Sequence, residues 1–166
     1  MISFVKFWIW EMLSARQFVG LALIGTLIPL TQTLTLVEMT DVVTKCALGQ
    51  NFTEASIPGL LKAEYSFDQA TKCFLRCMGH ELKVYEDASG VLMNAMWILL
   101  RPGRKAEEEN EFAASHAKCL EENLAKVPAD DYCEKAYATY KCFADEWVAL
   151  VKEMIVVPSV DLVFGV

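Results

Sequence analysis

Six cysteines and two histidines are the side chains of this 166-residue chain whose chemistry depends most on their spacing. Cys73 and Cys77 lie four residues apart, about 40° around a helix, so both sulfurs face the same side. Neighbouring sulfurs on one helical face gain little by bonding to each other and would instead tie their helix to two different partners. Cys133 and Cys142 are nine residues apart, roughly 180° around a helix, so their helix must lie between two partners.

The same residues fit neither a metal site nor a nucleophilic enzyme. One C-x3-C spacing without paired histidines is unlike a zinc site. The sequence contains no G-x-S-x-G, H-E-x-x-H or glycine-rich phosphate motif, and three bridges would leave no thiol as nucleophile. We therefore expect no enzymatic activity, no metal and no cofactor. The net charge of −7 argues against nucleic acid as a partner.

The first 33 residues are expected to lie outside the fold. Residues 18–30 form an almost uninterrupted apolar run, and the small residues Thr31 and Thr33 follow it, as in a secretory signal peptide. A start at Met12 instead of Met1 would give a signal of ordinary length. The alternative is an uncleaved signal anchor, although the run of about 13 residues is shorter than the roughly 20 that span a bilayer. The sequence predicts a secreted, extracellular domain at 34–166, where six cysteines would form three disulfides.

The apolar periodicity of the domain predicts an all-α fold with about six short helices. Ser66 and Gln69 would form a capping box at the start of the third helix, and Asp130 would cap the sixth. No strand is expected before residue 155. An apolar tail, 155–166, should cover another apolar surface, and Asn51 begins an N-x-T glycosylation sequon. The expected helices are residues 34–46, 56–64, 66–84, 91–100, 105–126 and 131–154.

The complete cysteine pattern is C-x26-C-x3-C-x41-C-x13-C-x8-C. The residues around the cysteines at 71–78, 132–137 and 141–143 add to it, as does the segment 157–161 in the tail. The pattern resembles that of the six-cysteine insect odorant-binding proteins, which include the pheromone-binding and general odorant-binding proteins. The resemblance covers about residues 36–166.

This resemblance implies three disulfides, Cys46–Cys77, Cys73–Cys133 and Cys119–Cys142. That pairing agrees with the argument from helical faces, which by itself leaves all fifteen pairings open. The resemblance also implies helices crosslinked around an apolar ligand cavity. Each closed loop would add on the order of 3 kcal/mol to stability, which offsets packing lost to a hollow core.

The family resemblance implies a carrier that takes small apolar volatile ligands, odorants or pheromones, to receptors in olfaction. Delivery to an odorant receptor and a homodimer are the expected protein contacts. A rival hypothesis is a secreted structural or protein-interaction module without a ligand cavity. A carrier needs an enclosed apolar cavity, whereas an interaction module does not, so the interior of the fold distinguishes the two.

Two sets of residues are expected to line the cavity, although ordinary core packing is the alternative for each. Gly79 stands where moth proteins often carry a small hydroxyl residue, so a polar contact to a ligand from that position is in doubt. The resemblance implies Met39, Leu75, Gly79, His116 and Phe143. The residues themselves add Met96, Trp97, Tyr140 and Trp147.

His116 is also a candidate pH switch, because histidine titrates near neutral pH. The hypothesis is that acidification charges His116 and moves the tail 155–166 on or off the cavity. A structural or surface histidine is the alternative. Asp161 is the only acid in the tail, so protonation of the tail itself should have a weak effect.

Overall fold

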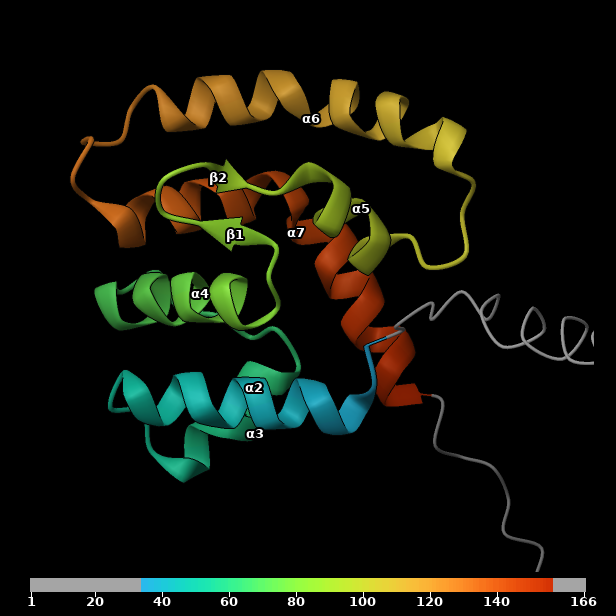
Figure 1. Ribbon diagram of the computed structural model, residues 1–166. Helices are drawn as coiled ribbons and strands as arrows, with labels where there is room; N and C mark the ends of the chain where they lie inside the picture. Colours follow the sequence, from blue (N-terminus) through green and yellow to red (C-terminus); the bar gives the residue numbers. More distant parts are fainter. Residues whose placement is uncertain (1–33, 157–166) are drawn as a thin grey trace, which may run out of the picture. The chain divides into compact units, whose positions relative to one another are not determined.

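Six helices and one small hairpin make up the computed structural model, which describes residues 34–156 (Figure 1). The predicted all-α class is therefore confirmed, although the hairpin was not expected. No helix in this range is long and apolar enough to cross a membrane. The elements are α2 (Leu36–Gly49), η1 (Glu54–Ser56), α3 (Ile57–Leu61), α4 (Gln69–Glu81), β1 (Tyr85–Glu86), β2 (Gly90–Val91), α5 (Met93–Leu100), η2 (Ala106–Glu108), α6 (Glu109–Leu124) and α7 (Tyr132–Val156).

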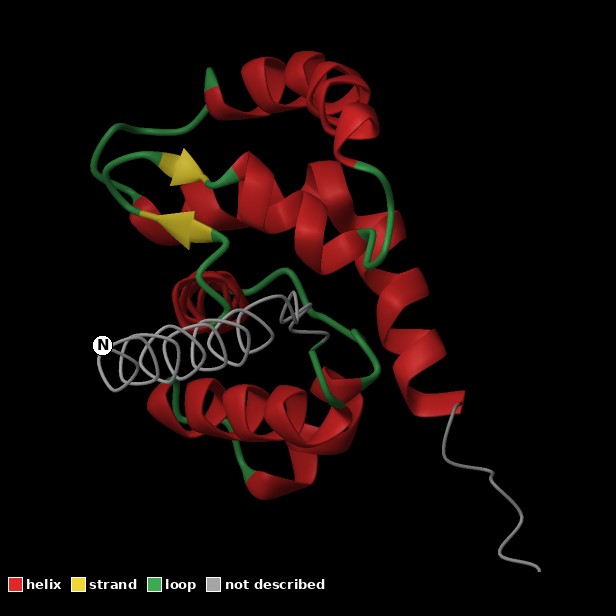
Figure 2. Cartoon of the chain, turned by 45° about the vertical axis from the view of Figure 1, so that its right-hand side comes forward, coloured by secondary structure: helices red, strands yellow, loops and turns green. Residues whose placement is uncertain are grey.

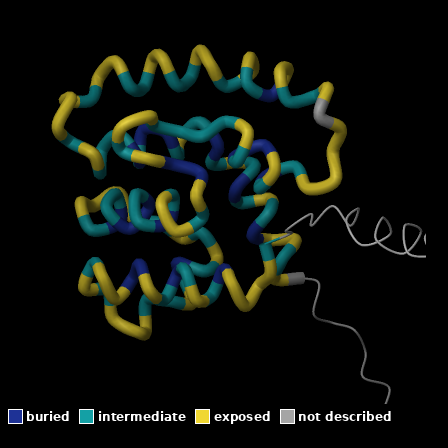
Figure 3. The backbone as a smooth tube through the Cα atoms, viewed as in Figure 1, coloured by how far each residue is buried: buried dark blue, intermediate teal, exposed yellow. Residues whose placement is uncertain are grey.

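Helix α4 lies at the centre of the domain. It packs against α7 and β1 on one side and against α2 on the other, and α6 lies along α7. Figure 2 views α4 nearly end-on, between α2 and the hairpin. Buried positions, dark blue in Figure 3, lie on the sides of α2, α4, α5 and α7 that face one another. The core is therefore shared by helices that are far apart in the sequence.

Both ends of α4 differ from the sequence prediction. The cap is Asp68, whose Oδ1 accepts a hydrogen bond from the Thr71 backbone N–H at 2.8 Å, and not Ser66. Ser66 Oγ instead donates to Asp68 Oδ2 at 2.7 Å, so it supports the capping side chain. Aspartate and serine are equally good caps, so propensity could not choose between them.

The C-terminal end of α4 is a Schellman motif built without glycine. Lys83 has a φ of 57°, its N–H donates to His80 O at 3.0 Å, and the Val84 N–H donates to Gly79 O at 2.9 Å. Glycine usually occupies this left-handed position. The helix consequently ends at Glu81, before the predicted Val84, and turns the chain directly into β1.

The other helix boundaries shift by up to four residues, the most at the start of α6, which begins at Glu109 and not at residue 105. Helix α2 begins with a capping box made by Thr35 and Glu38 and continues to Gly49. The cap of α7 is Asp131, whose Oδ1 accepts from the Glu134 N–H at 2.9 Å, so the prediction for Asp130 is wrong. Helix α7 continues through Val156, and the rest of the predicted tail and the predicted signal peptide lie outside the described residues.

A short antiparallel hairpin connects α4 to α5. Tyr85 pairs with Val91 and Glu86 with Gly90, so the expectation of no strand before residue 155 is wrong. Asp87 at the turn accepts a hydrogen bond from Arg76 Nε at 2.8 Å and pairs with a second guanidinium nitrogen and with His80 Nε2. These bonds fix the hairpin to α4.

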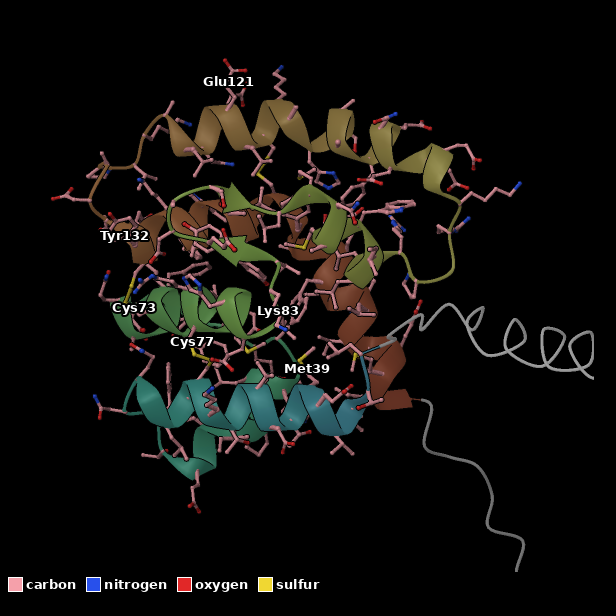
Figure 4. The ribbon with its side chains drawn as sticks, in the orientation of Figure 1. Met39, Cys73, Cys77, Lys83, Glu121 and Tyr132 are labelled. Atoms are coloured by element: carbon pink, nitrogen blue, oxygen red, sulfur yellow. A yellow bond between two sulfur atoms is a disulfide. The ribbon has the colours of Figure 1, made fainter. Side chains whose placement is uncertain are left out.

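Three disulfides crosslink the helices: Cys46–Cys77, Cys73–Cys133 and Cys119–Cys142. They are the three pairs that the family resemblance implies, and the described residues contain no free cysteine. Cys73 and Cys77, labelled on α4 in Figure 4, thus reach α7 and α2 respectively. Helix α7 is held to α4 by Cys133 and to α6 by Cys142, as the nine-residue spacing predicts.

Candidate ligand cavity

An apolar cavity lies between α4, α5, α7 and the hairpin. The volume of the cavity is about 60 Å³, several times the roughly 10–15 Å³ that a single water molecule needs. Its lining residues are Leu75, Met78, Gly79, Leu82, Val84, Tyr85, Met96, Leu99, Leu100, Ala136, Thr139, Tyr140, Phe143 and Trp147.

The wall from α7 follows from helical periodicity. The lining positions on this helix, from Ala136 to Trp147, recur at intervals of three and four residues, so they share one face. Cys133 and Cys142 hold this helix to α4 and α6. The crosslinks therefore fix the distance between the wall on α7 and its neighbours.

Gly79 allows the hairpin to close the cavity from the side of α4. A Cβ at this position would lie 2.7 Å from Tyr85 Cβ, closer than two carbon atoms can approach. Tyr85 thus occupies the space that a side chain at residue 79 would need. A polar contact from residue 79 is therefore excluded by packing as well as by the absence of a side chain.

The structure brings most of the predicted lining residues together. Of the family-implied set, Leu75, Gly79 and Phe143 line the cavity. The remaining predicted residues at the cavity are Met96, Tyr140 and Trp147.

Three predicted residues do not line this cavity. Met39, labelled on α2 in Figure 4, is 2% exposed and belongs to the packed core. Trp97 packs its ring on Phe112 of α6, with ring centroids 5.2 Å apart, and lines a separate polar cleft between α5 and α6. His116 is likewise on α6, which contributes no residue to the cavity lining. Met39 and His116 lie on helices that do not line the cavity, and Trp97 lies on the side of α5 that faces α6. Sequence spacing does not resolve these differences.

His116 is held between aromatic rings and hydrogen-bond acceptors. Its ring stacks on Phe143 with centroids 4.4 Å apart, and its Nε2 lies 2.9 Å from Glu146 Oε2. Nδ1 lies 2.8 Å from the Phe112 carbonyl oxygen. Glu146 Oε1 also accepts from Arg101 at 2.6 Å, which links α5, α6 and α7. Because Phe143 lines the cavity, His116 touches the cavity wall from behind, and its role as a pH switch stays a prediction.

The lining carries no acid or base apart from two tyrosines. Desolvation by burial raises the pKa of Tyr140 to about 12, and it also raises the pKa of Tyr85. Trp147 Nε1, the ring nitrogen of another lining residue, donates to Tyr65 Oη at 3.1 Å. The cavity is therefore electrically neutral across the physiological pH range.

Sequence reasoning missed several lining residues, and Thr139 and Ala136 are the informative ones. Both follow from Tyr140, Phe143 and Trp147 by continuing the same helical face toward the N-terminus. Their spacing predicts both positions, but threonine and alanine side chains are small and occur as often on other helical faces. Tyr85 and Val84 could not be found this way, because they belong to the hairpin.

A small helical domain with three crosslinks and a neutral apolar cavity has the architecture of a binding protein for small uncharged molecules. Within the described residues, no group of acidic, histidine or cysteine side chains could hold a metal ion. The chain belongs to the PBP/GOBP family, whose sequence model matches residues 31–146. This family consists of non-enzymatic odorant-binding carriers.

Relatives from two mosquitoes support the assignment. Odorant-binding protein 22 of Aedes aegypti is 26% identical over 112 residues, which cover 68% of this chain and 76% of the relative. The crystal structure of odorant-binding protein 22a of Anopheles gambiae is 33% identical, with a TM-score of 0.55 over 64% of this chain and 96% of that one. A second structure of the Anopheles protein contains bound cyclohexanone. It is 31% identical, with a TM-score of 0.57, and the match covers 69% of this chain and 96% of that one.

Proposed function

We propose that this protein is a secreted carrier that binds small apolar odorants in the cavity between α4, α5, α7 and the hairpin. The observation that carries the proposal is the cavity itself, which is apolar, neutral and walled by crosslinked helices. An interaction module without a ligand would gain stability from filling this space. The bound cyclohexanone in the similar Anopheles structure supports the same use of the fold.

The cavity is small and partly open, so it favours a compact ring, and the remainder of a larger ligand would extend through the open side. Its volume of about 60 Å³ is below the roughly 150 Å³ of an engineered cavity that binds benzene, so a bound ring would have to shift the lining side chains. Burying about six CH₂ groups at ~0.8 kcal/mol each contributes roughly 5 kcal/mol before the cost of association, so the Kd should be no tighter than on the order of 0.1–1 mM. Selectivity would then come from shape and from one polar contact.

Displacement of a fluorescent apolar probe by cyclohexanone tests the proposal. The disulfide-bonded chain from residue 34 onward should release the probe when cyclohexanone is added, and should not release it for a charged molecule of similar size. Failure of cyclohexanone and of other small apolar rings to displace the probe would refute the carrier function.

A variant that fills the cavity locates the binding site. Ala136→Leu adds three carbons to the wall on α7 and should abolish displacement, because the space is small. Ala149→Leu, at an exposed position of the same helix, is the matched control and should bind as the wild type does. Equal binding by both variants would place the ligand elsewhere.

The wider biological role extends this proposal. Delivery of the ligand to an odorant receptor in olfaction, secretion after cleavage of residues 1–33 and assembly into a homodimer all stay predictions. Native mass spectrometry of material secreted by insect cells would show the mature N-terminus, any retained ligand and the oligomeric state together.

A further inference from the structure

The turn after α2 carries the only N-x-S/T triplet of the sequence, which is Asn51-Phe52-Thr53. Asn51 and Thr53 are exposed, whereas Phe52 is half-buried and packs against the core. Its ring contacts Phe74 of α4 edge-on, with ring centroids 5.9 Å apart. The two residues that an N-glycosylating enzyme recognises are therefore open to solvent, and the residue between them anchors the turn.

The backbone at Asn51 has a conformation that suits asparagine. Its φ is 63°, in the left-handed region that asparagine and aspartate adopt more readily than most other residues. Asn51 directly follows Gln50, the C-terminal cap of α2. Aspartate tolerates the same conformation, so Asn51→Asp removes the acceptor amide and preserves the turn.

The folded turn is a poor substrate for a glycosyltransferase. The backbone N–H groups of Asn51 and Phe52 donate to carbonyl oxygens in the last turn of α2. The disulfide Cys46–Cys77 ties this end of α2 to α4. An enzyme that must hold the peptide on both sides of the asparagine would have to break these contacts. Sugar transfer would therefore precede the folding of this turn.

We propose that Asn51 is an N-glycosylation site, modified while the chain enters the secretory pathway. The proposal rests on secretion, which is part of the function proposed above. The donor is an oligosaccharide on a polyisoprenyl diphosphate. The bond from the first sugar carbon to the diphosphate oxygen breaks, that carbon bonds to Asn51 Nδ2, and the amide proton and the diphosphate leave.

The glycan would lie away from the ligand cavity. The cavity lining begins at Leu75 and contains no residue of α2, η1 or α3. Figures 1 and 2 show α2 and α3 on one side of α4, with the hairpin and α5 on the other. A sugar on Asn51 should therefore leave ligand binding unchanged.

Expression of the full chain in insect cells tests the site. The secreted wild type should weigh more than its polypeptide, and a peptide N-glycosidase should remove the extra mass and convert the modified asparagine to aspartate. Asn51→Asp and Thr53→Ala should be secreted without the extra mass, whereas Thr53→Ser preserves the triplet and should retain it.

Secretion of the wild type at its bare polypeptide mass would overturn the proposal. Failure of the chain to be exported would instead refute secretion, and the domain from residue 34 behind an established signal peptide then decides whether Asn51 is modified. Lack of the glycan on that exported domain would also overturn the proposal.

Two measurements on purified protein test the order of events and the placement of the sugar. Oligosaccharyltransferase with its lipid-linked donor should modify the reduced, denatured chain and not the folded, oxidised chain, and equal modification of both would contradict transfer before folding. Displacement of the apolar probe by cyclohexanone should be the same before and after enzymatic removal of the glycan. A loss of displacement in the glycosylated form alone would contradict a sugar remote from the cavity.

Discussion

The close approach of Gly79 and Tyr85 predicts opposite effects for the same substitution at two helical glycines. In Gly79→Ala, the new Cβ would lie 2.7 Å from Tyr85 Cβ, and it could be accommodated only by moving the hairpin backbone. In Gly49→Ala, at the end of α2, nothing lies within 4 Å of the new Cβ. Gly49→Ala is therefore a control for the helix propensity of alanine alone.

The size of each effect follows from two opposing terms. Replacing glycine with alanine in a helix stabilises it by roughly 0.5–1 kcal/mol, because the unfolded chain loses freedom. Overpacking a well-packed site costs about 1–3 kcal/mol. Gly49→Ala should thus raise the free energy of unfolding by about 0.5–1 kcal/mol, and Gly79→Ala should lower it by between about zero and 2.5 kcal/mol.

Urea denaturation of the oxidised variants, followed by far-ultraviolet circular dichroism, gives both free energies. Moving the hairpin also displaces Tyr85 from the cavity wall, so Gly79→Ala should weaken probe binding while Gly49→Ala should not. If the two variants were stabilised equally, the claim that Tyr85 packs against Gly79 would be wrong, and with it the account of how the hairpin closes the cavity.

Two further predictions concern the crosslinks and the hairpin. Replacing both Cys119 and Cys142 with alanine opens a loop of 23 residues and should lower the free energy of unfolding by about 3 kcal/mol. Replacing both Cys73 and Cys133, which are 60 residues apart, should lower it by about 4 kcal/mol by the same chain-entropy estimate. Urea denaturation of the two double variants checks this order. The hydrogen bonds from Arg76 lower the pKa of Asp87 from 3.8 to about 2 in the folded chain, so its stabilising contribution is present above pH 3.8 and is lost as the pH falls toward 2. Asp87→Asn should therefore show a flatter fall in unfolding free energy between pH 4 and pH 2 than the wild type, and parallel curves would contradict the pairing.

The parts of the fold and of the cavity that could be predicted from the sequence are those that follow from the intervals between residues. The intervals between cysteines fixed which faces of α4 and α7 carry crosslinks, and a family resemblance supplied the three pairs. The same periodicity located α7 within two residues at each end. Phe143 was expected at the cavity from the family resemblance and Trp147 from the residues themselves, and both line it.

The features out of reach depend on contacts between elements. The end of α4 is set by Lys83 in a left-handed conformation that lysine rarely adopts, so no glycine marked it. The hairpin is too short to show an alternation of apolar and polar residues. It is held in place by the ion pair between Arg76 on α4 and Asp87 in the hairpin turn. Whether Trp97 faces the cavity or α6 depends on a rotation of α5, whose apolar residues surround it almost completely. Ile98 shows the same ambiguity, since it is 55% exposed within that helix.

The crosslinks of α7 are unevenly distributed along its length. Both bonds, at Cys133 and Cys142, lie before Phe143, and no covalent link follows in the described part of the helix, where Trp147 completes the wall. Fraying of the part of α7 after Cys142 would open the cavity to solvent, while the crosslinked part before it would keep its position against α4 and α6. Substitutions after Cys142 that weaken this part of the helix should therefore raise the rate at which a bound ligand leaves, whereas loss of either disulfide should lower the free energy of unfolding.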